Sequence, residues 1–126
     1  MAAECNVSII ADVTGLGEGL QFLEKFTVTG TIIKAVLNRQ IQATTNTAEA
    51  LNLCGISTVE LVIIKATSND LLIDVDCANA GAFAETQSVA EGECRIIKPD
   101  GTDDIFIKNE DGTEVCTVDY LIVGSA

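Results

Sequence analysis

The chain has 126 residues, a length that fits a single domain. Its 19 acidic and 7 basic residues give a net charge of -12, which argues against nucleic acid and anionic membranes as partners. Histidine is absent, and this excludes a histidine-based catalytic triad and removes the commonest metal ligand.

The first 20 residues are predicted to form an N-terminal arm or an edge strand. A β-type run from Asn6 to Val13 ends at Gly15, Gly17 and Gly19. These glycines indicate a surface loop, because a phosphate-binding loop would need a further glycine and a helix behind it. Residues 20–25 then fit either a helical turn or an extended edge.

Residues 21–126 are predicted to form a β-sandwich. The stretch from residue 26 to 37 reads as one bent strand or as two strands meeting at Gly30. The alternation continues into the next segment, where Leu37, Arg39 and Ile41 share one face and Asn38 and Gln40 the other.

Two further runs carry the strongest strand signals. Residues 59–66 are the most apolar segment, which predicts a central strand covered on both faces. Residues 71–77 alternate cleanly, so Asp74 and Asp76 are expected to face out, while the opposite face holds Leu71, Ile73, Val75 and Cys77.

The C-terminal part continues as short strands separated by turns. Residues 94–98, 105–108 and 115–123 are predicted strands, and turn-forming residues stand between them at 99–101 and 109–113. The pattern predicts an all-β fold, a single antiparallel β-sandwich or jelly-roll-like domain of about eight strands. No membrane-spanning run or secretory signal is predicted, which indicates synthesis in the cytoplasm.

Polar residues in charge-poor segments mark the candidate interface. Three threonines at alternating positions line one face, and the other candidates belong to the polar stretch from residue 38 to 52. Such surfaces occur where subunits meet and also on ordinary solvent faces. The candidates are Thr27, Thr29, Thr31, Arg39, Gln40 and Gln42.

Acidic turns supply the weak metal candidates Asp100, Asp103 and Asp104. Oxygen clusters of this kind can hold Ca²⁺, but the spacing does not match an EF-hand loop. Solvated acidic turns that keep sheet edges soluble are the alternative. No cofactor is predicted.

The five cysteines lie too far apart for a CxxC motif, the nearest pair being seventeen residues apart. Two interpretations stay open: reduced, buried thiols, or structural disulfides and crosslinks between subunits. The cysteines are Cys5, Cys54, Cys77, Cys94 and Cys116. A catalytic cysteine would need a base and an orienting partner, and neither is indicated, so no enzymatic activity is predicted.

Four strings carry a resemblance to a known class of proteins. The first runs from residue 34 to 45, and the second, residues 51–57, reads Leu-Asn-Leu-Cys-Gly-Ile-Ser. Residues 59–69 form an apolar strand ending in Lys-Ala-Thr-Ser-Asn, and residues 120–123 read Tyr-Leu-Ile-Val. Over residues 31–126 the chain resembles small virion structural proteins of tailed bacteriophages. It departs from their pattern at Cys54, at Ala66, and at Ala90, where Pro-Gly-Glu would be expected.

The resemblance implies a compact sandwich or jelly roll, frequently trimeric, that belongs to a virion. We expect a capsid decoration or cement protein that binds the major capsid protein as a homotrimer, without nucleic acid or membrane partners. A head-tail neck or fibre component is the first alternative. A lectin-like, calcium-dependent ligand-binding module of a cell surface is the second.

Overall fold

The computed structural model describes residues 3–42, 47–99, 104–110 and 114–125, and these residues form strands and one short 3-10 helix. None of the described segments is a helix long and apolar enough to cross a membrane. The strands are β1 (Asn6–Val13), β2 (Leu20–Thr27), β3 (Lys34–Gln42), β4 (Glu49–Ala50), β5 (Thr58–Ser68), β6 (Leu71–Cys77), β7 (Gln87–Val89), β8 (Cys94–Ile97), β9 (Asp104–Asn109) and β10 (Cys116–Ser125), with the helix η1 at Ala80–Ala82.

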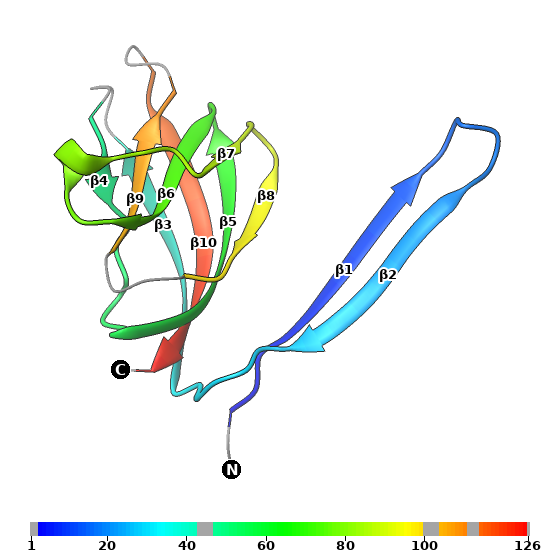
Figure 1. Ribbon diagram of the computed structural model, residues 1–126, viewed down its shortest axis with the longest axis horizontal. Helices are drawn as coiled ribbons and strands as arrows, with labels where there is room; N and C mark the ends of the chain where they lie inside the picture. Colours follow the sequence, from blue (N-terminus) through cyan, green and yellow to red (C-terminus); the bar gives the residue numbers. More distant parts are fainter. Residues whose placement is uncertain (1–2, 43–46, 100–103, 111–113, 126) are drawn as a thin grey trace.

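Two four-stranded antiparallel sheets pack face to face (Figure 1). One has the strand order β3-β10-β5-β8, and the other has the order β4-β9-β6-β7. The long β10 is central in the first sheet, where it pairs with β3 on one side and β5 on the other. This arrangement confirms the predicted all-β, antiparallel sandwich.

The core lies between the two sheets and consists mostly of branched aliphatic side chains. Ile64 of β5, Ile122 of β10, Ile73 of β6 and Ile107 of β9 are completely buried in it. Burial of each such side chain contributes about 1.5–3 kcal/mol to folding. With few aromatics available, these residues fill the core because their shape suits the pleated surface of a sheet.

The most apolar segment is central, as predicted. Strand β5 lies between β10 and β8. Its side chains Val62 and Ile64 enter the core, while Leu61 on the opposite face is 3% exposed. Coverage of that opposite face is only partial, because Lys65 remains exposed there.

Strands β1 and β2 form a separate two-stranded hairpin, called the arm below. Their register pairs Asn6 with Thr27 at the base and Val13 with Leu20 near the tip. The arm extends away from the sandwich and joins it near the start of β3 (Figure 1). Residues 20–25 are therefore a strand and not a helical turn, and the arm ends at Thr27, beyond the expected limit at residue 20.

Gly30 separates β2 from β3, so residues 26–37 belong to two strands. Its backbone has φ +115°, a conformation that residues other than glycine rarely adopt. A Cβ at this position would also meet the carboxylate of Glu60. The direction in which the arm leaves the sandwich thus depends on a glycine-specific turn.

The prediction for β6 needs correction at two residues. Asp74 lies opposite the core face, as expected, but it is only 4% exposed because the loop after β6 covers it. Its Oδ1 accepts a hydrogen bond from the Asp76 N–H (3.1 Å) and its Oδ2 accepts one from the Ala84 N–H (2.9 Å). An irregular register after Asp74 also places Cys77 with Phe106, outside the main core.

Candidate protein interface

The outer face is the side of the β3-β10-β5-β8 sheet that is turned away from the core. A row of apolar residues crosses it in register, one from each strand: Leu37, Leu121, Ile63 and Ile96. Leu37 is 80% exposed and Ile96 is 38% exposed, while the other two are half-buried. A contiguous apolar row open to solvent is typical of a surface that binds another protein.

The rows on either side differ in chemistry. Towards the C-terminal end of β10, the neighbouring row is also apolar and consists of Ala35, Val123 and Leu61. On the other side, a polar row consists of Arg39, Asp119, Lys65 and Cys94. The outer face is therefore an apolar band with a polar edge, the arrangement seen at protein interfaces.

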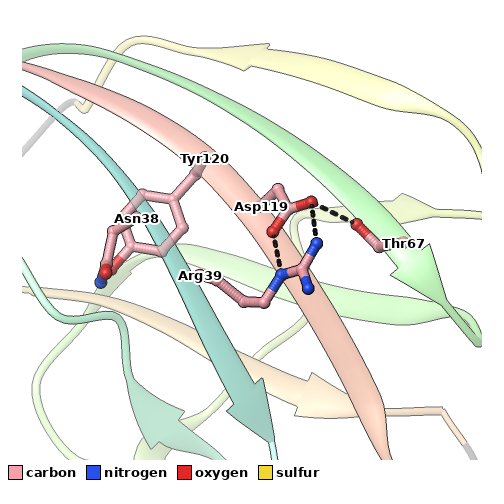
Figure 2. A network of polar contacts seen from close by, with 5 residues as sticks. All are labelled: Asn38, Arg39, Thr67, Asp119 and Tyr120. Atoms are coloured by element: carbon pink, nitrogen blue, oxygen red, sulfur yellow. Dashed lines mark hydrogen bonds and ion pairs between the residues drawn. The ribbon is translucent and has the colours of Figure 1, made fainter.

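The polar row is organised by Asp119 (Figure 2). Arg39 donates to it through Nε (2.6 Å to Oδ1) and Nη2 (3.0 Å to Oδ2), and Thr67 Oγ1 donates to Oδ2 (2.9 Å). These hydrogen bonds, that of Arg39 first, lower the pKa of Asp119 from 3.8 to about 2. Asp119 therefore stays ionised near neutral pH and holds the Arg39 guanidinium through two hydrogen bonds.

Asn38 and Tyr120 lie next to this network but point to the opposite, core-facing side of the sheet, where they connect strands. Asn38 Nδ2 donates to Tyr120 Oη (2.8 Å); Figure 2 shows both side chains. Tyr120 Oη in turn donates to the carbonyl of Asn52 (2.6 Å). Burial raises the pKa of Tyr120 to about 12. The hydroxyl stays protonated and ties β10 to the segment after β4.

A second apolar surface, called the arm stripe below, runs along one face of the arm. Because paired residues share a face and side chains alternate, every second residue belongs to it. The arm stripe consists of Val7, Ile9, Ala11, Val13, Leu20, Phe22, Glu24 and Phe26. Val7 at the base is buried, whereas Phe22 further out is 55% exposed.

The base of the arm stripe already packs against the outer face. Val7 and Leu61 form one buried cluster, and Ile9 and Ile63 pack against it. Beside this contact lies a groove of about 370 Å³, whose lining includes Cys5, Ile32, Ile33, Ala35, Leu121 and Val123. The two apolar surfaces are thus complementary where they meet within one chain.

Charge differs between the same two regions. The four strands under the outer face carry the bases Lys34, Arg39, Lys65 and Arg95 against the acids Glu60 and Asp119, a net charge of +2. Residues 6–27 of the arm carry Asp12, Glu18 and Glu24 against Lys25, a net charge of -2. In a chain of net charge -12, this sheet is a locally basic region.

The predicted interface residues lie in three different environments. Thr27 is exposed and donates from Oγ1 to Asn6 Oδ1 (2.6 Å), and Thr29 and Thr31 are exposed between the arm and β3. Arg39 lies on the outer face. Gln40 faces the other side of its sheet, where its amide bonds the Ala50 carbonyl (3.0 Å) and the Asn52 N–H (2.8 Å).

Gln42 requires correction, because it is buried and cannot reach a partner. It is 1% exposed; its Nε2 donates to the Thr47 carbonyl (2.6 Å) and its Oε1 accepts from the Asn109 N–H (3.0 Å). It links the two sheets instead. The residues that sequence reasoning missed are the apolar ones, Leu37 and Phe22, although alternation had placed Leu37 beside Arg39.

The acidic residues predicted as weak metal ligands do not form a metal site in the described part of the chain. Asp104 is an exposed residue at the start of β9, and Asp100 and Asp103 lie outside the described residues. Among the residues that are described, no three acidic or cysteine side chains gather as metal ligands would.

The five cysteines are free and differ in burial. Cys77 and Cys116 are buried, as the thiol interpretation expected, whereas Cys5 and Cys54 are half-buried and Cys94 is exposed. Burial, with smaller contributions from Asp70 and Glu91, raises the pKa of Cys116 to about 11. This thiol is therefore protonated and packs as a small apolar group.

Comparisons of the chain with protein-family models, with curated proteins and with solved structures found no match. Function is accordingly inferred from the outer face and the arm stripe.

Proposed function

We propose that the chain is a non-enzymatic structural protein of a virion, most specifically a decoration or cement protein of a tailed-bacteriophage capsid. The observation that carries the proposal is the pair of uncovered apolar surfaces, the outer face and the arm stripe. Both are built on paired strands, so each presents its apolar side chains in a defined register. Such surfaces suit permanent contact between protein subunits.

The polar groups with shifted pKa values support a structural role over a catalytic one. Asp119 accepts hydrogen bonds from Arg39 and Thr67, and Tyr120 is bonded to Asn38 and Asn52. Each group is stabilised in its resting protonation state, whereas a general acid or base needs a pKa near the working pH.

The class of assembly follows from the resemblance of residues 31–126 to virion proteins of tailed bacteriophages. In such a particle the partner is the major capsid protein, and several copies, as in a trimer, would bind around one lattice point. The acidic C-terminal half suits a basic patch of the shell. A neck or fibre position would use the same surfaces. A calcium-dependent lectin role has no supporting cluster in the described part of the chain.

The test is co-sedimentation of the purified full chain with empty shells of the phage that encodes it. We expect saturable binding at a fixed ratio to the major capsid protein. A double variant, Phe22→Ser with Leu37→Thr, should lower bound protein at least about tenfold, because both apolar anchors are lost. The matched control, Ile10→Thr with Leu23→Thr, removes two exposed apolar residues from the opposite face of the arm, outside both surfaces, and should bind normally. Absence of the chain from purified virions and from sedimented shells would reject the proposal.

A further inference from the structure

The arm lacks a partner of its own along most of its length. Every residue of β2 is exposed, and Val7 is the buried residue of β1. An isolated two-stranded hairpin is marginally stable at best in water, because one of its faces must leave apolar side chains in solvent. The distal arm stripe, defined as Val13, Leu20 and Phe22, therefore needs a covering surface.

We propose that the distal arm stripe of one copy packs on the outer face of a second copy of this chain, so that neighbouring copies exchange arms. This inference rests on the proposed function, because it assigns one partner to the same two surfaces. The arm's own sandwich is not that partner: the arm points away from it (Figure 1), and Leu37 remains 80% exposed.

The contact at the base of the arm supplies the first argument for a second copy. There, Val7 and Ile9 of the arm stripe pack against Leu61 and Ile63 of the outer face. The distal residues continue the same stripe, and Leu37 and Leu121 continue the same face. Docking between copies would repeat a contact whose chemistry already works within one chain.

Charge supplies the second argument. The polar row of the outer face holds Arg39 and Lys65 against Asp119, whereas the arm has a net charge of -2, so two arms facing each other would repel. Glu24, the charged residue of the arm stripe, would meet a sheet that presents Lys65 and Arg39.

Sedimentation velocity of the full chain over a range of concentrations tests self-association. We expect an oligomer whose dissociation constant rises at least about tenfold in Phe22→Ser and, separately, in Leu37→Thr. Ile10→Thr and Leu23→Thr, both on the opposite face of the same arm, should associate as the unchanged chain does. A chain that is monomeric at all concentrations would overturn the inference.

Mixing the two disrupted variants tests the pairing itself. Phe22→Ser keeps an intact outer face and Leu37→Thr keeps an intact arm, so an equimolar mixture should form heterodimers that neither variant forms alone. Arms that pair with arms would leave Leu37→Thr associated by itself, and that result, or a mixture that stays dissociated, would contradict the inference. Far-ultraviolet circular dichroism of each variant checks that the sheets are retained.

A crosslinking experiment gives a readout that does not depend on loss of binding. Cys94 is the exposed native thiol of the outer face, and Glu24→Cys places a second thiol on the arm stripe. A short bismaleimide should then give a dimer band, and adding Cys94→Ser should remove it. A band that persists without Cys94, or no dimer band in either variant, would count against arm exchange.

The two proposals can fail separately. A chain that exchanges arms but binds no shell would refute the virion role and leave the inference intact. A chain that binds shells as an independent monomer would refute arm exchange and leave the virion role intact.

Discussion

The arm and the sandwich are built from the same kinds of residue, yet their side chains have opposite surroundings. All eight residues of β2 are exposed, whereas four of the six residues of β9 are buried. Both strands alternate or cluster apolar side chains, and both pair with an antiparallel neighbour. The difference is a second layer: β9 lies in a sheet that packs on another sheet, and the arm has none. Hydrogen bonding to a neighbouring strand is enough to form a sheet, but a hydrophobic core forms only when a second layer packs on that sheet.

A core residue and an arm residue of comparable apolar character should differ most in their effect on folding. Ile73→Ala removes a fully buried side chain and should lower the free energy of unfolding by about 2–5 kcal/mol. Phe22→Ala should change it by no more than about 0.5 kcal/mol. Urea denaturation at a dilution where the chain is monomeric measures both. An equal loss in the two variants would mean that the arm belongs to the cooperative core.

Two glycines extend the same contrast to the backbone. A Cβ at Gly124 would collide with the backbone carbonyl of Thr58, next to a register shift between β10 and β5. Gly124→Ala should therefore destabilise the sandwich by about 1–3 kcal/mol. Gly19→Ala, in the arm turn, meets no atom within 4 Å and should be neutral. Thermal unfolding compares the two, and an unaffected Gly124→Ala would show that the two strands can separate freely there.

The buried amide of Gln42 tests whether polar groups inside the sandwich matter more than polar groups on the outer face. Gln42→Leu removes the acceptor of the Asn109 N–H and the donor to the Thr47 carbonyl, and should cost about 1–3 kcal/mol. Arg39→Leu breaks an exposed, solvent-screened ion pair and should lower stability less than Gln42→Leu does. Chemical denaturation of both variants measures the two losses of stability and so tests their ranking. A larger loss from Arg39→Leu would reverse the ranking.

Alkaline pH should destabilise the sandwich through β10, which holds both Cys116 and Tyr120. Their folded pKa values, about 11 and about 12, lie above the ordinary values of 9.0 and 10.0. The folded chain therefore keeps protons that the unfolded chain loses, so this stabilisation is complete below pH 9 and is lost as pH rises to 12. Melting temperatures measured across that window should fall, and the fall should be shallower in Cys116→Ala. An identical slope would contradict the role of burial.

Acid should have the smallest effect, at the exposed network of the outer face. The pKa of Asp119, about 2, lies below the ordinary value of 3.8, so its stabilisation is present above pH 3.8 and is lost as pH falls towards 2. Asp119→Asn should flatten this part of the melting-temperature profile. Asp12→Asn, in the arm, should leave it unchanged and serves as the control.

Several features of the fold could be read from local sequence. Alternation correctly separated Leu37, Arg39 and Ile41 from Asn38 and Gln40, and the apolar run at 59–66 correctly predicted a central strand. These predictions succeeded because side-chain direction along a strand has a fixed period of two. The same rule failed at Cys77, where an irregular register shifted the period.

The sequence by itself determined that the chain forms antiparallel strands and which side chains share a face, since both properties arise from a residue and its near neighbours. Only the tertiary structure decided which faces are covered. It buried Asp74 under a loop and Gln42 between the sheets, and it left Leu37 and the distal arm stripe in solvent. Whether a strand face is buried depends on segments that are distant in sequence. The local sequence pattern does not show whether another sheet or a loop will pack on that face.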